Sequence, residues 1–217
     1  MRLTDVKPVT TGKISDNLYA AKTGTVNFFV LSTNNGNICI DSGFGRKLIA
    51  RELDLLGIDP ASITHLFLTH SDFDHANGLA IFKMAEIFLS SGEEQMINGQ
   101  TARMAGIIHN SKIKRAHHLL NDGDVVAVGS TTVKAISSPG HTPGSMSYLV
   151  NESILFVGDA FKLVNNKVFP KRHFYNMDSR QHKESIRKLA HLDNIRLVCT
   201  AHNGYTKEFS EAIGDWK

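Results

Sequence analysis

The sequence contains little cysteine and no long apolar run, and each absence argues against a class of protein. Both cysteines, Cys39 and Cys199, lie in apolar segments typical of strands, where a thiol usually acts as a small buried hydrophobic group. They give no sign of a disulfide framework. No stretch of roughly eighteen uncharged apolar residues occurs, and the N-terminal segment lacks the apolar core of a secretory signal. We therefore expect a cytoplasmic protein with no membrane partner.

The sequence also has no large excess of positive or negative charge. The formal net charge is +3, and lysine and arginine are scattered along the chain. Because the basic stripe with which proteins bind polyanions is missing, the sequence gives no support for a nucleic-acid partner. Hydrophobic residues, in contrast, make up 41% of the 217 residues, which is enough to form one sizeable buried core. We predict a single domain over residues 1–217.

Segments typical of strands occur in both halves of the chain. Asn34-Asn35-Gly36 signals a hairpin, and an apolar stripe followed by Gly57 predicts an amphipathic helix over residues 45–56. Asp178 can cap a later helix, whereas residues 91–116 give weak signals and are predicted as helix and loop that could border a substrate cleft. The predicted strands are 14–21, 26–32, 37–41, 66–69, 87–90, 125–128, 132–136, 145–150, 154–157 and 195–200, with a helical segment at 75–84. This order suits two sheets packed face to face with helices outside.

Side chains that can hold metal gather where predicted strands end. The segment Thr69-His70-Ser71-Asp72-Phe73-Asp74-His75 follows an apolar strand, and three further residues of this kind follow β-type runs in turn-like settings. Histidine nitrogen and carboxylate oxygen are the ligands of divalent first-row metals in hydrolytic sites, and two metals about 3.5–4 Å apart can clamp one bridging hydroxide. The seven predicted ligands of one two-metal site are His70, Asp72, Asp74, His75, His141, Asp159 and His202.

Spacing alone leaves an alternative open. Alternate residues of an extended segment face the same side, so His70, Asp72 and Asp74 can converge. Taken by itself, the segment could also be a solvated loop with a helix-capping aspartate and two surface histidines. The three companions, all at the ends of β-type runs, favour the shared site.

With these residues identified, the chain resembles the metallo-β-lactamase superfamily of hydrolases over nearly its whole length. The resemblance rests on Asp41 in Ile40-Asp41-Ser42-Gly43, the segment from His70 to His75, and His141, Asp159 and His202. It implies an α+β fold, the αββα sandwich of two mixed β-sheets with helices on the outer faces and the site at one edge. It also implies a set of roles: His70, Asp72 and His141 hold one metal, Asp74, His75 and His202 hold the other, Asp159 bridges them, and Asp41 orients a ligand.

One position departs from the pattern of the superfamily. The usual motif is H-x-H-x-D-H, and this sequence has Asp72 in place of the second histidine. The resemblance implies two divalent metal ions, most commonly zinc, whereas a hard carboxylate oxygen favours iron or manganese. The flavodiiron branch is similar in having a carboxylate here together with a di-iron centre. In that branch a flavin domain follows, which a partner protein would have to supply here.

The resemblance implies a metal-dependent hydrolase that uses a metal-bridging hydroxide on an ester, lactone, thioester or amide bond of a small molecule, as acyl-homoserine lactonases and glyoxalase II do. Asp74 is the candidate catalytic residue, because it can orient the water and pass its proton to the leaving group. Tyr175 or His173 can bind a substrate oxygen from a loop that would overhang the site, and Lys162, Lys171 or Arg172 can attract an anionic group. The same loop could be an ordinary solvated basic loop.

Three other functions remain open at this point. A phosphodiesterase is disfavoured by the missing basic stripe. A redox di-iron module that reduces oxygen or nitric oxide is motivated by Asp72. A metal-binding regulator without catalysis is the third, and the complete set of ligands argues against it. The sequence gives no indication of the oligomeric state.

Overall fold

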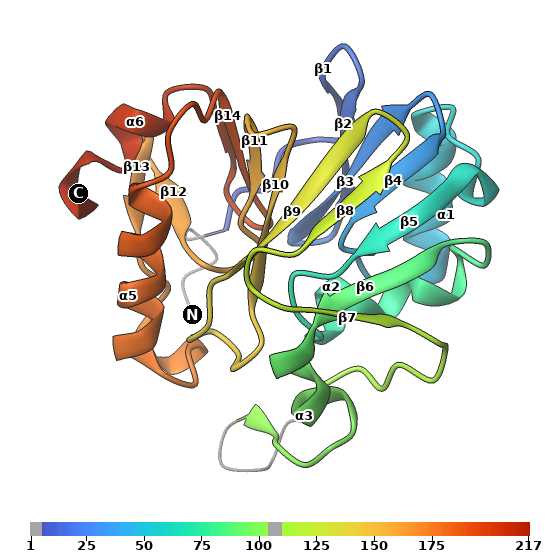
Figure 1. The fold of residues 1–217 in the computed structure, drawn as a ribbon. Helices are drawn as coiled ribbons and strands as arrows, with labels where there is room; N and C mark the ends of the chain where they lie inside the picture. Colours follow the sequence, from blue (N-terminus) through green and yellow to red (C-terminus); the bar gives the residue numbers. More distant parts are fainter. Residues whose placement is uncertain (1–5, 104–109) are drawn as a thin grey trace.

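The structure is a computed structural model that describes residues 6–103 and 110–217. The start of the N-terminal segment, residues 1–5, and residues 104–109 of the predicted helix-and-loop segment lie outside the described residues. Figure 1 shows two β-sheets stacked face to face, with helices against the outer face of each. The predicted α+β arrangement of two mixed sheets between helical layers is confirmed.

In the described part of the chain, seven strands form the first sheet, in the order β1-β2-β3-β4-β5-β6-β7. Their bounds are β1 Gly12–Ser15, β2 Leu18–Thr23, β3 Val26–Thr33, β4 Gly36–Ile40, β5 Ile63–Phe67, β6 Glu86–Ser90 and β7 His118–Leu120. Strands β1 to β4 pair antiparallel, and β4 to β7 pair parallel. Because parallel strands end at the same edge, the segments that follow β4, β5 and β6 start close together.

The second sheet has six strands within residues 6–103 and 110–217, in the order β15-β14-β11-β10-β9-β8. Their bounds are β8 Val125–Val128, β9 Thr131–Ser137, β10 Met146–Val150, β11 Ile154–Phe156, β14 Leu197–Thr200 and β15 Gly204–Thr206. Strands β11 and β14 pair parallel, and the other neighbours pair antiparallel. A separate hairpin joins β12 (Lys162–Val164) to β13 (Lys167–Phe169).

Helices cover both outer faces. Helix α1 (Arg46–Leu55) lies against the first sheet, and α5 (Ser179–Ala190) with α6 (Phe209–Ala212) lies against the second (Figure 1). Helix α5 begins as predicted, because the Asp178 carboxylate accepts the backbone N–H groups of Arg180 and Gln181. The short helices are α2 Phe73–Ala76, α3 Glu94–Ile97, η2 Pro60–Ser62, η3 Asn77–Ala80, η4 Ser91–Glu93, η5 His173–Tyr175 and η6 Gly214–Trp216. Every helix among the described residues is too short or too polar to cross a membrane.

The core has three apolar layers that follow from the alternation of side chains along each strand. In β3, Phe29 and Leu31 point between the sheets, whereas Phe28 and Val30 point toward α1. The layer between the sheets joins these residues to Tyr148 and its neighbours in the second sheet. A strand buried on both faces reads as a continuous apolar run, which is why β3 is easily recognised in the sequence.

Two predicted elements are wrong in their extent. The strand predicted at 14–21 is two strands, β1 and β2, because the chain turns at Asp16-Asn17. The helix predicted at 75–84 is the two short helices α2 and η3. Gly78 lies so close to the preceding loop that a Cβ atom there would meet the Ser42 carbonyl oxygen at 2.2 Å, and its N–H donates to the Gly43 carbonyl at 3.1 Å. These contacts hold the chain away from a continuous helix.

Candidate metal centre

The predicted ligands follow strands that end at a shared edge of the two sheets, on loops and on the short helix α2. After β5 the backbone stays extended, because the Leu68 N–H donates to the Phe88 carbonyl and the Thr69 carbonyl accepts the Met146 N–H, both at 2.8 Å. The second of these bonds joins the first sheet to the beginning of β10. The segment that starts at His70 is therefore fixed by both sheets. Rigid strands that end in ligand-bearing loops are a common way to hold a metal site.

All seven predicted ligands come together in the structure. They form three overlapping sets, and within each set one ligand-type atom per residue lies within 4.8 Å of the others. The sets are His70, Asp72 and His141; His70, His75 and Asp159; and Asp74, His75 and His202. The first and third sets are the two groups that, by the resemblance, are expected to hold one metal each.

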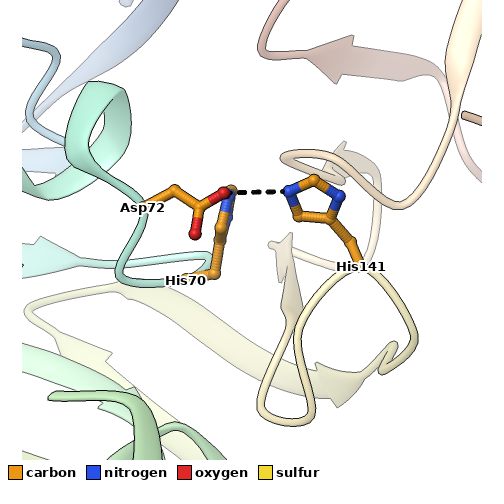
Figure 2. Close-up of side chains that lie close together, drawn as sticks. All are labelled: His70, Asp72 and His141. Atoms are coloured by element: carbon orange, nitrogen blue, oxygen red, sulfur yellow. Dashed lines mark hydrogen bonds and ion pairs between the residues drawn. The ribbon is translucent and has the colours of Figure 1, made fainter. Parts of the chain in front are cut away.

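Asp72 and His141 face each other in the first set. Figure 2 shows the His141 ring approaching the Asp72 carboxylate from a separate loop, and the distance from His141 Nε2 to Asp72 Oδ2 is 3.2 Å. The distance from His70 Nε2 to the same oxygen is 3.5 Å. The first set thus combines two imidazoles with one carboxylate oxygen, a donor set that divalent first-row metals accept.

Asp159 lies between the two outer sets. Its Oδ2 atom is 3.3 Å from His141 Nε2, and its Oδ1 atom is 3.3 Å from His202 Nε2 and 3.8 Å from His75 Nε2. In the third set, Asp74 Oδ2 lies 3.5 Å from His202 Nε2 and 4.0 Å from His75 Nε2. One carboxylate therefore offers an oxygen to each side, as a bridging ligand would.

The ionisation of these groups suits ligands. Burial opposes the charge of Asp72, but the neighbouring His70 and His141 hold the pKa of its carboxyl well below the usual range. Burial likewise opposes the charge of Asp159, yet His202 and Lys171 hold its pKa well below the usual range. Burial lowers the pKa of His141 to about 4, so its imidazole is neutral. Two carboxylates are thus charged and one imidazole is neutral, the forms in which they bind metal.

Buried atoms without hydrogen-bond partners provide the test of whether these residues fit metal ions. Among the described residues, His70 Nε2, His75 Nε2 and Asp159 Oδ1 are buried and have no hydrogen bond. Buried polar atoms in proteins are otherwise almost always paired. These three atoms belong to the three residues of one set, in which one ligand-type atom per residue lies within 4.8 Å of the others. The nitrogen and oxygen donors therefore fit divalent metal ions.

Asp41 supports the site from behind. Its Oδ1 atom accepts the Thr69 N–H at 2.8 Å, and its Oδ2 atom lies 2.8 Å from His75 Nδ1. Asp41 has a φ of 60°, a left-handed conformation that aspartate and asparagine tolerate better than most residues. The contact directs His75 Nε2 toward the other ligands, which is the role that the resemblance predicted for Asp41.

Replacing Asp41 by asparagine should weaken zinc binding about 10- to 100-fold, since groups that orient a metal-binding histidine typically have effects of this size. Asparagine keeps the left-handed backbone and a carbonyl oxygen for the Thr69 N–H, but it removes the negative charge beside His75. Competition with a chelator of known affinity measures the change. Asp16, an exposed aspartate in the β1–β2 turn, gives the control Asp16→Asn. Equal zinc affinity in Asp41→Asn and wild-type protein would contradict the assignment.

His75 should be an imidazolium in the metal-free protein at pH 8. Burial alone would lower its pKa, but Asp41 and Asp74 outweigh burial and raise the pKa of His75 to about 10. The raised value means that this charge stabilises the metal-free fold below pH 6.5, and that the contribution is lost as the pH rises through about 10. Because a histidine must be neutral to bind a metal ion, zinc binding should displace this proton.

Nitrogen NMR of the metal-free protein tests this prediction directly. At pH 8 both ring nitrogens of His75 should carry a proton, and zinc should remove the proton from Nε2. His141 is the internal control, because its pKa of about 4 keeps it neutral at the same pH. A neutral His75 ring at pH 8 without metal would show the prediction to be wrong.

The structure also brings in residues that the sequence prediction missed. Arg103 donates to Asp72 Oδ2, and its Nη1 lies 2.9 Å from His141 Nε2. Glu93, which is fully buried, accepts hydrogen bonds from Ser71 and Thr142. Glu93 follows β6 at the shared edge, which is a weak signal in the sequence. Arg103 lies in a segment without a clear pattern and gives no such signal.

The predicted substrate-binding residues lie in or beside η5. His173 is exposed, whereas Tyr175 is half-buried, and the Tyr175 carbonyl accepts a hydrogen bond from Arg103. Lys171, one of the three predicted candidates for anion binding, lies 2.9 Å from Asp159 Oδ2, so its ammonium is at the site rather than in bulk solvent. The loop from Lys171 to Tyr175 therefore borders the candidate centre at two points, through Lys171 and through the Tyr175 carbonyl.

Comparisons with known proteins agree with this geometry. The sequence matches the family profile described as "Metallo-beta-lactamase superfamily" over residues 21–202. It is 32% identical over 125 residues to BaeB of Bacillus velezensis, a probable polyketide biosynthesis zinc-dependent hydrolase, covering 56% of this chain and 48% of that protein. It is 30% identical over 144 residues to the hydroxyacylglutathione hydrolase of Bartonella henselae, covering 65% and 49%. The chain thus spans about half the length of these curated relatives.

A solved structure is similar over most of its length. BJP-1, a subclass B3 metallo-beta-lactamase of Bradyrhizobium japonicum, superposes with a TM-score of 0.72, covering 92% of this chain and 80% of that one at 21% identity. A likeness at this level of identity establishes the fold and leaves the substrate open.

Proposed function

Because the chain belongs to the metallo-beta-lactamase superfamily, we propose that it is a metal-dependent hydrolase of an ester, lactone, thioester or amide bond in a small molecule. The observation that carries the proposal is the meeting of nitrogen and oxygen donors from distant parts of the chain, with Asp159 between two outer sets. Metal ions held there would polarise the bond under attack and lower the pKa of water. The chain's own residues would orient the substrate and move the proton.

Asp74 is the residue that we propose to move the proton. Its side chain is 33% exposed, compared with 17% for Asp72 and 7% for Asp159, so it is the carboxylate most open to an incoming substrate. Its Oδ2 atom lies 3.5 Å from His202 Nε2, which places the carboxylate in the third set. An accessible carboxylate beside the reacting water can accept a proton and pass it to the leaving group.

The names of the relatives order the substrates to be tested. One relative is a hydroxyacylglutathione hydrolase, and another is a probable zinc-dependent hydrolase of polyketide biosynthesis. Both names support acyl compounds as the first substrates to try. We propose zinc as the first metal to test, with iron and manganese as alternatives because Asp72 supplies an oxygen donor.

A panel of thioesters, lactones, aryl esters, β-lactams and aryl phosphodiesters tests the proposal on protein loaded separately with zinc, manganese or iron. We expect turnover of a thioester, ester or lactone that requires metal and disappears in Asp159→Ala. Protein that binds its metals but hydrolyses none of these compounds would contradict a hydrolase. Turnover confined to the phosphodiesters would replace the proposed bond class by phosphodiester hydrolysis.

The presence of Asp72 in the first set favours one second candidate, a redox di-iron module supplied with electrons by a partner protein. Metal analysis and an optical spectrum of protein purified without added metal separate the two functions. A coloured iron protein without hydrolytic activity would favour the redox module. A colourless zinc protein with acyl hydrolase activity would exclude it.

A further inference from the structure

A guanidinium group lies on the first set of predicted ligands. Arg103 Nη1 donates to Asp72 Oδ2 and lies 2.9 Å from His141 Nε2, and its Nη2 donates to the Tyr175 carbonyl. The Arg103 side chain is only 13% exposed, so it is part of the site and not a mobile surface group. Arg103 thus contacts the two atoms, Asp72 Oδ2 and His141 Nε2, that the dashed line joins in Figure 2 and that lie 3.2 Å apart.

His141 decides whether this contact is compatible with a metal ion. When the proton of neutral His141 is on Nδ1, as metal binding through Nε2 requires, the Nε2 atom has a single lone pair, which can accept one hydrogen bond or bind one metal ion. A carboxylate oxygen has further lone pairs and can serve two partners. Arg103 and a metal ion at the first set therefore exclude each other at His141 Nε2, even where Asp72 could contact both.

The negative charge of Asp72 explains why the Arg103 guanidinium is held in this position. The Asp72 side chain is 17% exposed, and an unpaired carboxylate at this depth is costly. Arg103 supplies the opposite charge when no metal is bound, and a divalent ion would supply it when bound. The same carboxylate is thus neutralised by one of two alternative cations.

We propose that Arg103 is an internal competitor for the metal ion of the first set, so that metal binding there must displace the guanidinium from His141. This inference rests on the proposed function, because it takes the first set to be a metal site. Two consequences follow. Arg103 lowers the affinity of the first set for metal, and full displacement of Arg103 breaks its hydrogen bond to the Tyr175 carbonyl, one of the contacts that hold the loop with the predicted substrate-binding residues.

Zinc titration of metal-stripped protein against a fluorescent chelator tests the competition without any measurement of activity. Arg103→Met removes the guanidinium while it keeps an unbranched side chain, and Arg103→Lys keeps the charge but loses the planar fork. Arg180→Met is the matched control, because Arg180 is an exposed arginine of α5 that pairs with Glu184. It removes the same charge from the surface.

We expect Arg103→Met to bind the first-set zinc about 10- to 100-fold more tightly than the wild type, the size of effect that loss of a charge-assisted hydrogen bond produces. Arg103→Lys should be intermediate, and Arg180→Met should match the wild type. The effect should vanish in the Asp72→Asn background, which assigns it to the first set. Metal-free Arg103→Met should also melt at a lower temperature, because Asp72 has lost its counter-ion.

Four results would overturn the inference, and the last of them would also overturn the proposed function. Unchanged zinc affinity in Arg103→Met would show that Arg103 does not compete. Weaker binding would show that Arg103 supports the metal-bound state. If Arg103→Met does not fold, the zinc affinity of Arg103→Lys is the deciding measurement. An affinity equal to that of the wild type would then show that Arg103 does not compete with the metal ion. Wild-type protein that retains no zinc at all would overturn the proposed function together with this inference.

Discussion

Replacing Asp74 by asparagine should lower kcat for ester or thioester hydrolysis about 10²- to 10⁴-fold, the usual contribution of a general acid–base group. Asparagine has nearly the same shape and keeps one oxygen that can face the third set, but it cannot carry a proton. Asp74 is the most exposed of the three carboxylates in the predicted sets, at 33% of its side-chain surface, so a substrate can reach it. The measurement is steady-state hydrolysis at saturating zinc, with bound metal determined in the same samples.

Asp72→Asn is the matched control for this prediction. It removes a carboxylate from the same short segment, but Asp72 lies in the first set, 3.2 Å from His141, rather than beside His202. Its effect should be a loss of metal affinity that excess zinc largely restores. The defect of Asp74→Asn should persist when zinc is saturating, because the missing function is proton transfer.

The leaving group gives a sharper test. An alkoxide must be protonated as it departs, whereas an aryl thiolate leaves readily without a proton. If Asp74 donates that proton, Asp74→Asn should slow an alkyl ester far more than an aryl thioester. Equal defects for both substrates, or a defect that follows metal loss in parallel, would contradict the role of Asp74.

The meeting of the predicted ligands could be anticipated because each of them follows a recognisable strand. β5, β11 and β14 are apolar runs, and parallel or neighbouring strands that end at one edge place the following residues together. Asp159 and His202 follow β11 and β14, which pair parallel. The roles assigned to these residues in metal binding and catalysis stay predictions.

The residues missed by the sequence prediction share a physical cause. Arg103 and Glu93 are charged residues outside any strand, and charged residues are usually exposed. What makes them part of the site is tertiary packing, since Arg103 lies against the first set and Glu93 becomes fully buried between two loops. Periodicity reports which face of an element is apolar and contains no information about such contacts.

The errors in the predicted elements have the same origin. Residues 75–84 have apolar spacing that suits a helix, yet α2 ends at Ala76 and η3 follows at once. The close approach of Gly78 to Ser42 involves a loop more than thirty residues earlier in the chain. Local pattern could not predict a contact that depends on where β4 ends in space.

Replacing Glu93 by alanine should destabilise the metal-free protein by about 2–4 kcal/mol, because several buried donors would lose their acceptor. Glu93 Oε1 accepts the Ser71 N–H at 2.8 Å and the Ser71 hydroxyl at 2.6 Å, and Oε2 accepts the Thr142 hydroxyl at 2.7 Å. Burial raises the pKa of the Glu93 carboxyl, because desolvation disfavours its charged form. This desolvation opposes folding, so the loss of unfolding free energy in Glu93→Ala is smaller than three separate hydrogen bonds would suggest. Urea unfolding measures the difference.

Glu93→Gln is the control that separates hydrogen bonding from charge. Glutamine keeps an oxygen for both Ser71 donors, and its amide can donate to the Thr142 hydroxyl, which can in turn donate to Ser145 Oγ at 2.9 Å. We therefore expect Glu93→Gln to lose less than about 1 kcal/mol. Alanine and glutamine variants of equal stability would contradict this assignment.

The position of Glu93 links stability to the candidate centre. Ser71 lies between His70 and Asp72, and Thr142 directly follows His141, so one carboxylate connects the two loops that carry the first set. The His141 loop packs so closely against the segment that contains Glu93 that a Cβ atom on Gly144 would lie 2.0 Å from the Glu93 backbone nitrogen. Glu93→Ala should therefore weaken zinc binding at the first set as well as folding, whereas Glu93→Gln should bind zinc as the wild type does. Wild-type zinc affinity in folded Glu93→Ala protein would show that the two loops hold their ligands in place without this carboxylate.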